Sequence, residues 1–356
     1  MVEWLAGNRI IGTTAERPAL GLPSGSVGGW VEVARTTLGS NGNTFTVSSI
    51  PDKRYYFVLI NPAFTNAGSG NTFRLGSGGS EDSGSNYAYR RSTNGGSDVT
   101  GINQSSGIIP IGGYSTEHEL LTMHIANKSD KEKLCIHNRC YSIAGAGNAP
   151  LRIEQASKWT NTSNAIDMMK ATLNSSGNFA SGTEIVVLGY DPADTHTTNF
   201  WEELSSVTTT SSGTISSGTI TAKKYLMYQI IGKKASGTGT GSSRFQFNGD
   251  TGSNYAQRNS INGTHYTYGS QASANIGGDG NTAGEMVMYT GFIINNASTE
   301  KLWLGFSAFG NSSGNNIGNK GEIFDKWANT SDQITSILCM NMNFDAGAKM
   351  TIWGSD

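Results

Sequence analysis

Gly84-Ser-Asn-Tyr-Ala-Tyr-Arg90 returns 168 residues later as Gly252-Ser-Asn-Tyr-Ala-Gln-Arg258. Two further matches share this offset: Glu132-Lys-Leu134 with Glu300-Lys-Leu302, and Lys158-Trp-Thr-Asn-Thr-Ser163 with Lys326-Trp-Ala-Asn-Thr-Ser331. The shared positions include Trp, Tyr, Arg, Lys and Glu, which this chain does not over-use, so composition alone does not explain the match. The sequence therefore predicts a tandem duplication.

The repeat also sets the expected domain boundaries. Trp30 matches Trp201 near the start of each copy, and Gly189 matches Gly354 near the end, where the offset has slipped to 165. We expect an N-terminal arm at residues 1–29, a first repeat at 30–191, a linker at 192–200 and a second repeat at 201–356. The arm is rich in Gly and Pro, but four apolar residues should anchor it to a neighbouring chain or to its own domain: Trp4, Leu5, Ile10 and Ile11.

Composition favours strands over helices. Gly, Ser, Thr and Asn supply 157 of the 356 residues, and all four either weaken helices or prefer turns and caps. Short apolar runs such as Tyr55–Ile60 and Tyr225–Ile231, bounded by turn residues, are typical of strands inside a two-sheet sandwich. One weak helix candidate lies at Asn164–Lys170. We expect an all-β chain of two tandem jelly-roll or lectin-like β-sandwiches after the short arm.

Turn chemistry supports the same fold. Asn94-Gly95 and Asn262-Gly263 lie between polar strand halves and fit tight hairpins, whose central residues need positive φ.

The apolar runs Met286–Tyr289 and Phe292–Ile294 each predict a strand of their own.

Charge and hydropathy limit the partners. The 25 basic and 27 acidic side chains give a net charge of −2, which offers no electrostatic reason to bind nucleic acid or an anionic membrane. No window approaches the 18 or so consecutive apolar residues of a membrane span, so we expect no membrane insertion. The N-terminus carries an acid where a signal peptide needs a basic region, which predicts synthesis in the cytoplasm without a signal peptide.

Few residues suggest chemistry. Three cysteines, Cys135, Cys140 and Cys339, cannot form a disulfide framework and lack zinc-finger spacing, so we expect buried or incidental thiols. The sequence contains scattered acidic residues that a glycan hydrolase could use, but no spacing selects a pair: Glu184, Asp191, Glu202, Glu203 and Asp325. We predict a protein without catalytic residues, cofactor or metal, and keep a glycan hydrolase as a minor alternative.

The repeated tyrosines and arginines allow two interpretations. Tyr87 and Arg90, like Tyr255 and Arg258, are three residues apart, so on a strand one points inward and the other outward. In the favoured interpretation the tyrosine packs, and the arginine either extends its charged end into solvent or pairs with a carboxylate such as Glu132 or Glu300. In the other, the four residues form a face for a glycan or a protein partner.

Several stretches resemble repetitive virion proteins of marine phages and environmental viruses, including archaeal ones. These are Trp4–Arg17, Gly145–Pro150, Asn254–Arg258, Ile294–Leu302, Lys326–Ser331 and Trp353–Asp356. The likeness implies a virion-surface protein of capsid, tail or fibre type whose partners are copies of itself or other virion proteins. A receptor-binding protein or a pair of carbohydrate-binding modules holding host surface glycan is the alternative. The first repeat departs from the pattern at Asp130–Lys133 and Cys135–Cys140.

Overall fold

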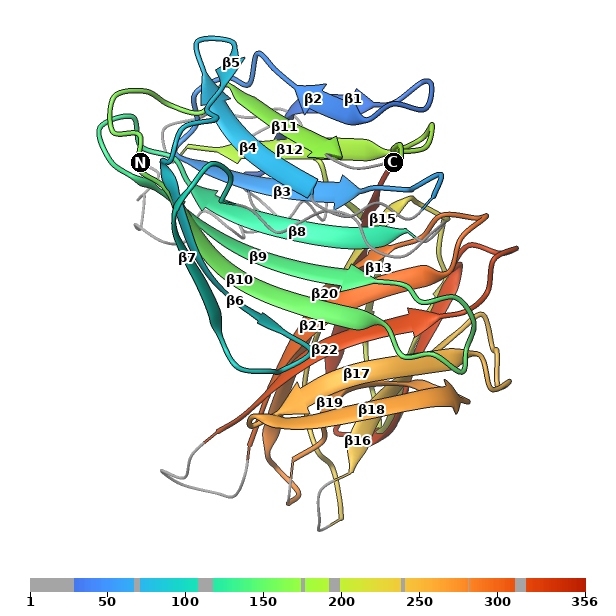
Figure 1. Ribbon diagram of the computed structural model, residues 1–356. Helices are drawn as coiled ribbons and strands as arrows, with labels where there is room; N and C mark the ends of the chain where they lie inside the picture. Colours follow the sequence, from blue (N-terminus) through green and yellow to red (C-terminus); the bar gives the residue numbers. More distant parts are fainter. Residues whose placement is uncertain are drawn as a thin grey trace, which may run out of the picture. The chain divides into compact units, whose positions relative to one another are not determined.

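The computed structural model describes residues 29–66, 71–107, 118–173, 177–191, 199–237, 241–280, 282–310 and 318–356. All regular structure in these ranges is β-strand (Figure 1). The chain divides into two compact units, Met1–Arg139 with Ile153–Glu202, and Cys140–Arg152 with Glu203–Asp356. No helix in the described ranges is long and apolar enough to span a membrane.

The first repeat consists of two antiparallel sheets. The larger has the order β1-β12-β3-β8-β9-β10-β6-β7 and the smaller β2-β11-β4-β5. The strands are β1 (Val31–Thr37), β2 (Thr44–Val47), β3 (Tyr55–Asn61), β4 (Asn71–Ser77), β5 (Ser80–Glu81), β6 (Tyr87–Thr93), β7 (Val99–Gln104), β8 (Glu119–Ala126), β9 (Lys133–Tyr141), β10 (Leu151–Trp159), β11 (Met168–Leu173) and β12 (Glu184–Tyr190).

The second repeat has the same plan, with a large sheet β13-β24-β15-β20-β21-β22-β17-β18 and a small sheet β14-β23-β16-β19. Its strands are β13 (Glu202–Thr208), β14 (Gly213–Thr219), β15 (Tyr225–Lys233), β16 (Ser242–Phe247), β17 (Tyr255–Ile261), β18 (Thr264–Gln271), β19 (Ala274–Gly278), β20 (Met286–Ile294), β21 (Lys301–Phe309), β22 (Asn319–Trp327), β23 (Ser336–Phe344) and β24 (Lys349–Ser355). Apart from the last strand of each small sheet, equivalent strands occupy equivalent places in the two repeats.

Apolar side chains from both sheets form the core of each sandwich. In the second repeat Trp303 and Trp327 of the large sheet pack on Phe247 of the small sheet, with ring centroids 5.1 and 5.8 Å away. Alternation along a strand then sends Leu302, Leu304 and Lys326 to the opposite, outer face of the large sheet. Equivalent residues on this outer face differ in exposure between the two repeats.

The predicted fold class is confirmed: the chain is all-β, and each repeat is a β-sandwich. The Asn262-Gly263 turn closes the β17–β18 hairpin with φ of +51° and +83°, as a tight hairpin requires. Asn94 and Gly95 also have positive φ, within a longer connection between β6 and β7.

Two local predictions are wrong. The helix candidate at Asn164–Lys170 runs into strand β11, whose alternate residues Met169 and Ala171 are buried. The two strands expected around Thr290-Gly291 are one continuous strand, β20. Residues 1–28 of the expected arm and residues 192–198 of the expected linker lie outside the described residues, and so do Trp4, Leu5, Ile10 and Ile11.

Candidate interaction surface

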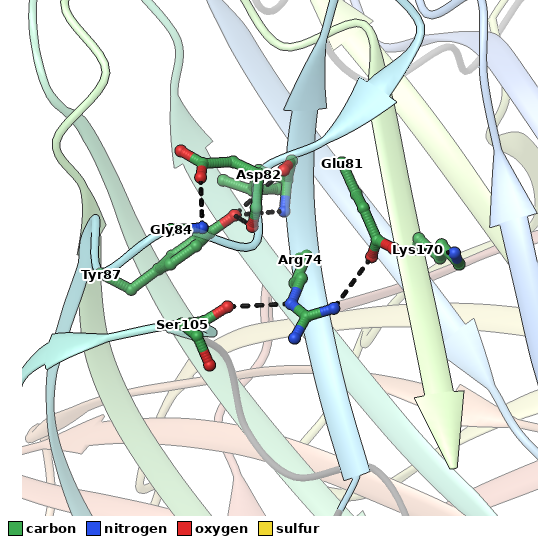
Figure 2. Close-up of polar contacts among 8 residues, drawn as sticks. Arg74, Glu81, Asp82, Gly84, Tyr87, Ser105 and Lys170 are labelled. Carbon is green, nitrogen blue, oxygen red and sulfur yellow. Dashed lines mark hydrogen bonds and ion pairs between the residues drawn. The ribbon is translucent and has the colours of Figure 1, made fainter. Parts of the chain in front are cut away.

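A carboxylate in the connection between β5 and β6 organises the first repeated cluster (Figure 2). Asp82 accepts a hydrogen bond from the backbone N–H of Gly84 at 2.8 Å. It also accepts from Asn86 Nδ2 at 2.8 Å and from Trp159 Nε1 at 2.7 Å. The Tyr87 hydroxyl lies 3.0 Å from the carbonyl oxygens of both Asp82 and Leu75. We call Asp82, Gly84, Asn86, Tyr87 and Trp159 the first clasp.

The second repeat has the same arrangement, which we call the second clasp. Asp250 accepts from Gly252 N at 2.8 Å, Asn254 Nδ2 at 2.9 Å and Trp327 Nε1 at 2.7 Å, and Tyr255 lies 3.2 Å from the Asp250 carbonyl. Burial alone would raise the pKa of each aspartate, but the hydrogen bonds from Trp, Asn and Gly outweigh it and lower the pKa below its usual range. Both carboxylates are therefore ionised and surrounded by donors, which suits a structural role.

A buried lysine completes each cluster. Lys301 Nζ donates to the carbonyl oxygens of Thr299 and Asn329 at 3.0 and 2.9 Å and lies 5.6 Å from the centroid of the Trp327 ring. Burial lowers its pKa to about 8. Lys133 has the same place in the first repeat, 5.6 Å from the ring of Trp159.

The structure corrects the predicted glycan or partner face at its tyrosines. Tyr87 is 1% exposed and Tyr255 is fully buried, and both hydroxyls face backbone groups, so neither can present a ring to a ligand. Sequence reasoning also missed Asp82 and Asp250, on which both clasps depend. They share the 168-residue offset and precede the repeated glycines by two residues, a spacing typical of Asx turns.

The first repeat has an ion cluster beside its clasp. Glu81 lies 2.9 Å from Lys170 Nζ and 3.3 Å from Arg74 Nη1, and Arg74 also donates to the Ser105 carbonyl at 2.9 Å (Figure 2). Burial alone would raise the pKa of Glu81, but these two cations lower it. The cluster joins β4, β5 and β11 of the small sheet.

Two of the acidic residues named as hydrolase candidates have internal roles. Glu184 accepts from the Thr37 hydroxyl at 2.6 Å and lies 3.4 Å from Arg35. Asp325 points into the second core, where burial raises its pKa well above the usual value. With its amide nitrogen facing the carboxyl group, Asn259 lies 2.6 Å from Asp325 Oδ1.

The outer face of the second large sheet carries the remaining repeated residues. Arg258, Glu300, Leu302, Leu304 and Lys326 form what we call the second face. Glu300 and Lys326 are paired at 2.8 Å and almost fully buried, and both leucines are buried as well.

Cys140–Arg152 belong to the same compact unit as Glu203–Asp356. Within that unit they contact the second face. Glu300 accepts hydrogen bonds from the Ser142 hydroxyl and, at 2.7 Å, from the Gly145 N–H. Lys326 donates to the Ile143 carbonyl, and Arg258 Nε donates to the Pro150 carbonyl at 2.8 Å. Each polar side chain of the second face thus bonds to this segment, mainly through its backbone.

The first repeat has equivalent residues on the corresponding face, four of the five identical in type, but there they are exposed. Arg90, Glu132, Leu134, Ile136 and Lys158 form what we call the first face. Glu132 and Lys158 are paired at 3.0 Å with 41% of each side chain exposed, while Leu134 and Ile136 are 58% and 61% exposed.

Arg90 pairs with a carboxylate, as the favoured interpretation expected, but not with one of the two it named. It pairs with Asp98 at 3.0 Å rather than with Glu132, whose partner is Lys158. The outward direction predicted for Arg90 and Arg258 agrees with the structure, and these two arginines remain candidates for a partner surface.

Two other surfaces of the second repeat are open to ligands. Tyr266 and Tyr268, two residues apart on edge strand β18, expose 37% and 46% of their area. A shallow apolar depression of about 700 Å³ lies among Ile231, Met286, Met288, Ala308 and Phe309. All three cysteines are buried thiols, and the described residues contain no group of three or more His, Cys, Asp or Glu placed to hold a metal ion.

Comparisons with known proteins assign no family. No protein-family model and no curated protein matches the chain. Among solved structures, mouse laminin alpha1 chain, domains LG4-5, is 8% identical over 93% of this chain and 92% of that one, with a TM-score of 0.16. Neisserial surface protein A is 7% identical over 80% of this chain and 96% of that one, with a TM-score of 0.10. At these TM-scores neither likeness bears on fold or function.

Proposed function

We propose that this chain is a non-enzymatic structural protein that works by assembling with other protein chains, as a capsid, decoration, tail or fibre component of a virion. The observation that carries the proposal is the first face. Its two exposed aliphatic side chains, flanked by an ion pair and an arginine, repeat a face that elsewhere in the chain bonds to a protein segment. Apolar residues ringed by polar ones are typical of protein interaction sites.

The clasps support the same function. The most elaborate polar clusters hold strands and connections together, with the carboxylate of each clasp already bonded to three donors. A particle exposed to the environment needs rigid sandwiches of this kind, and the buried thiols contribute through packing rather than through disulfides.

The test is the association state of the purified full chain. Light scattering across a hundredfold range of concentration, with negative-stain microscopy of the same samples, should show association into regular particles or filaments. A chain that stays monomeric over this range contradicts the assembly function. Removal of residues 1–29 in a parallel sample measures what the predicted arm contributes.

A second candidate function is glycan binding at Tyr266 and Tyr268. Side chains two residues apart on a strand point the same way, and exposed tyrosine rings side by side suit the apolar faces of sugar rings. A glycan array with the wild-type chain and the Tyr266→Ala/Tyr268→Ala variant tests this function. Binding that is lost only in the variant supports it, and an array without signal contradicts it.

A further inference from the structure

We propose that the first face is the docking surface for a second copy of this chain, whose β21–β22 connection lies there as Cys140–Arg152 lie on the second face. This inference rests on the proposed function and names the surface and the partner segment. Its consequence is directional, head-to-tail association.

The second face shows what the docking residues bind. Arg258, Glu300 and Lys326 bond to Cys140–Arg152, and three of these bonds go to backbone groups: the Ile143 carbonyl, the Gly145 N–H and the Pro150 carbonyl. Backbone groups are present in any segment of similar path. A different sequence in the same position could therefore satisfy the same three side chains.

The first face offers the same groups in the same order. Glu132, Lys158 and Arg90 stand 168 residues before Glu300, Lys326 and Arg258, and Leu134 and Ile136 stand before Leu302 and Leu304. On the second face the ion pair and both leucines are buried, whereas on the first face their counterparts remain exposed. An apolar pair and an ion pair of this kind are retained on a surface where folding alone does not require them.

The β21–β22 connection is the chain's own counterpart of Cys140–Arg152. Strands β9 and β10 stand at the same 168-residue offset from β21 and β22, so the two connections have the same length. A second copy is therefore the partner that already carries a segment of the required length between equivalent strands.

Charges at the edge of the contact agree with this partner. On the second face Arg152 lies 3.8 Å from Glu322 and 3.4 Å from His265 Nδ1. Lys320, with 70% of its side chain exposed, takes the place of Arg152 in the β21–β22 hairpin. Glu154 on the first repeat takes the place of Glu322, so a basic residue again meets an acidic one.

Asp98 adds a second acidic group at this edge. In β7 Thr100 pairs with Arg90, and in β18 Thr267 pairs with Arg258, so the two threonines are equivalent. Asp98 and His265 each stand two residues before them in the sequence and are therefore equivalent as well. Lys320 of the second copy would then face two carboxylates where Arg152 faces one carboxylate and an imidazole.

At one position the first face carries a large side chain where the second face has a glycine. A Cβ on Gly269 would collide with the backbone of Gly147 in the docked segment, and the same alignment of β7 with β18 places Ile102 in the first repeat opposite Gly269. The docking backbone must therefore stand farther from β7 than from β18 and pack on the Ile102 side chain, which is 72% exposed.

Because the two contacting surfaces differ, the association is heterologous. A copy docked in this way still presents its own first face, so successive copies form a closed ring or an open filament rather than a two-fold dimer.

The first experiment blocks the first face. Ile136→Asp puts a charge among the apolar contacts and should raise the dissociation constant of self-association at least about 30-fold. The matched control is Val99→Asp in the same sheet. Val99 pairs with Arg91 rather than Arg90, so its side chain points to the opposite side, and its variant should associate like the wild type.

The second experiment identifies the partner segment. Replacing residues 310–318 by an Asn-Gly turn keeps the β21–β22 hairpin but removes its connection. This variant and Ile136→Asp should each be monomeric alone, yet together they should form a 1:1 complex by light scattering, because one keeps the face and the other keeps the connection. Unchanged circular dichroism and thermal unfolding show that each variant is folded.

The outcomes separate the inference from the function. If the wild type associates and Ile136→Asp associates equally well, the first face is not the contact, although the assembly function stands. If both variants are monomeric but do not form a complex when mixed, the head-to-tail arrangement is wrong. If removal of residues 1–29 alone abolishes association while Ile136→Asp does not, the arm is the contact. A monomeric wild type overturns the inference together with the proposed function.

Discussion

Replacing Asp250 by alanine should destabilise the second repeat by about 3 kcal/mol. Trp327 is 1% exposed, so water cannot replace the lost acceptor at its Nε1, and an unpaired buried donor costs about 1–3 kcal/mol. The donors from Gly252 and Asn254 are in an exposed turn. Water can solvate them, and each lost bond to the carboxylate costs about 0.5–1 kcal/mol.

The assay is urea unfolding followed by hydrogen-exchange mass spectrometry, which assigns peptides to each repeat. Asp250→Ala should lower the unfolding free energy of peptides from the second repeat and leave the first repeat at its wild-type value. Asp82→Ala should do the reverse. Asp130→Ala, which removes an exposed surface carboxylate, is the matched control and should change neither repeat.

The pH dependence supplies a second readout. Because the folded pKa of Asp250 is lowered, its contribution is fully present above about pH 4, the pKa of an unfolded aspartate, and is lost as the pH falls further. The alanine variant should lack this acid-dependent loss. A second repeat whose stability changes by less than about 0.5 kcal/mol, with the same acid profile as the wild type, would refute the structural role of the clasp.

Three further predictions concern the cores. Burial raises the pKa of Asp325, so the wild-type second repeat loses stability as the pH rises above about 4, the pKa of an unfolded aspartate. In urea titrations the margin by which Asp325→Asn exceeds the wild type in stability should therefore grow as the pH rises from about 4, and a constant margin contradicts the pKa shift. Burial lowers the pKa of His137 from 6.5 to about 3, so the first repeat should lose about 5 kcal/mol as the pH falls across this interval, and His137→Gln should flatten that slope. Gly305→Ala places a Cβ against the Tyr228 hydroxyl and 2.9 Å from the Thr290 carbonyl oxygen and should cost about 1–3 kcal/mol of unfolding free energy in urea titrations. Tyr228→Val should restore only part of this loss, because the clash with the Thr290 backbone remains.

The fold could be predicted because its determinants are local. Runs such as Tyr55–Ile60 are apolar enough for a buried strand, and Asn262-Gly263 has the positive φ values that a two-residue hairpin needs. Where local signals were weak, the prediction failed. Met168–Leu173 has no strong strand pattern, and pairing with β2 and β4 makes it a strand; Gly291 suggests a break, but it is paired on both sides.

The site could be predicted only in part. The three-residue spacing correctly places Tyr87 inside and Arg90 outside. It could not show that the tyrosine hydroxyl bonds to backbone groups, or that Lys158 rather than Arg90 pairs with Glu132, because these contacts join strands far apart in sequence. The difference in burial between Leu134 and Leu302 was also beyond the sequence, since the two residues are identical and only their surroundings differ.

A comparison of the two repeats separates residues that folding requires from residues that a binding partner would require. In the core, equivalent residues differ greatly in size between the two repeats. Tyr228 fills the space above Gly305 in the second repeat, where the first repeat has Val58 in place of the tyrosine and His137 in place of the glycine. Trp303 likewise stands where the first repeat has Cys135. A core residue can be replaced in this way because the residue it packs against lies in the same sandwich and can be replaced together with it.

The exposed first face, in contrast, keeps most of the residue types of the second face. Glu132, Leu134 and Lys158 are identical to Glu300, Leu302 and Lys326, although in the first repeat they leave a large part of their surface in water. An exposed ion pair contributes little to stability, and an exposed leucine contributes less than a buried one. Folding therefore gives little reason to keep this combination, whereas a partner that meets the same side chains does, and a second copy of the chain carries a connection of the same length between equivalent strands.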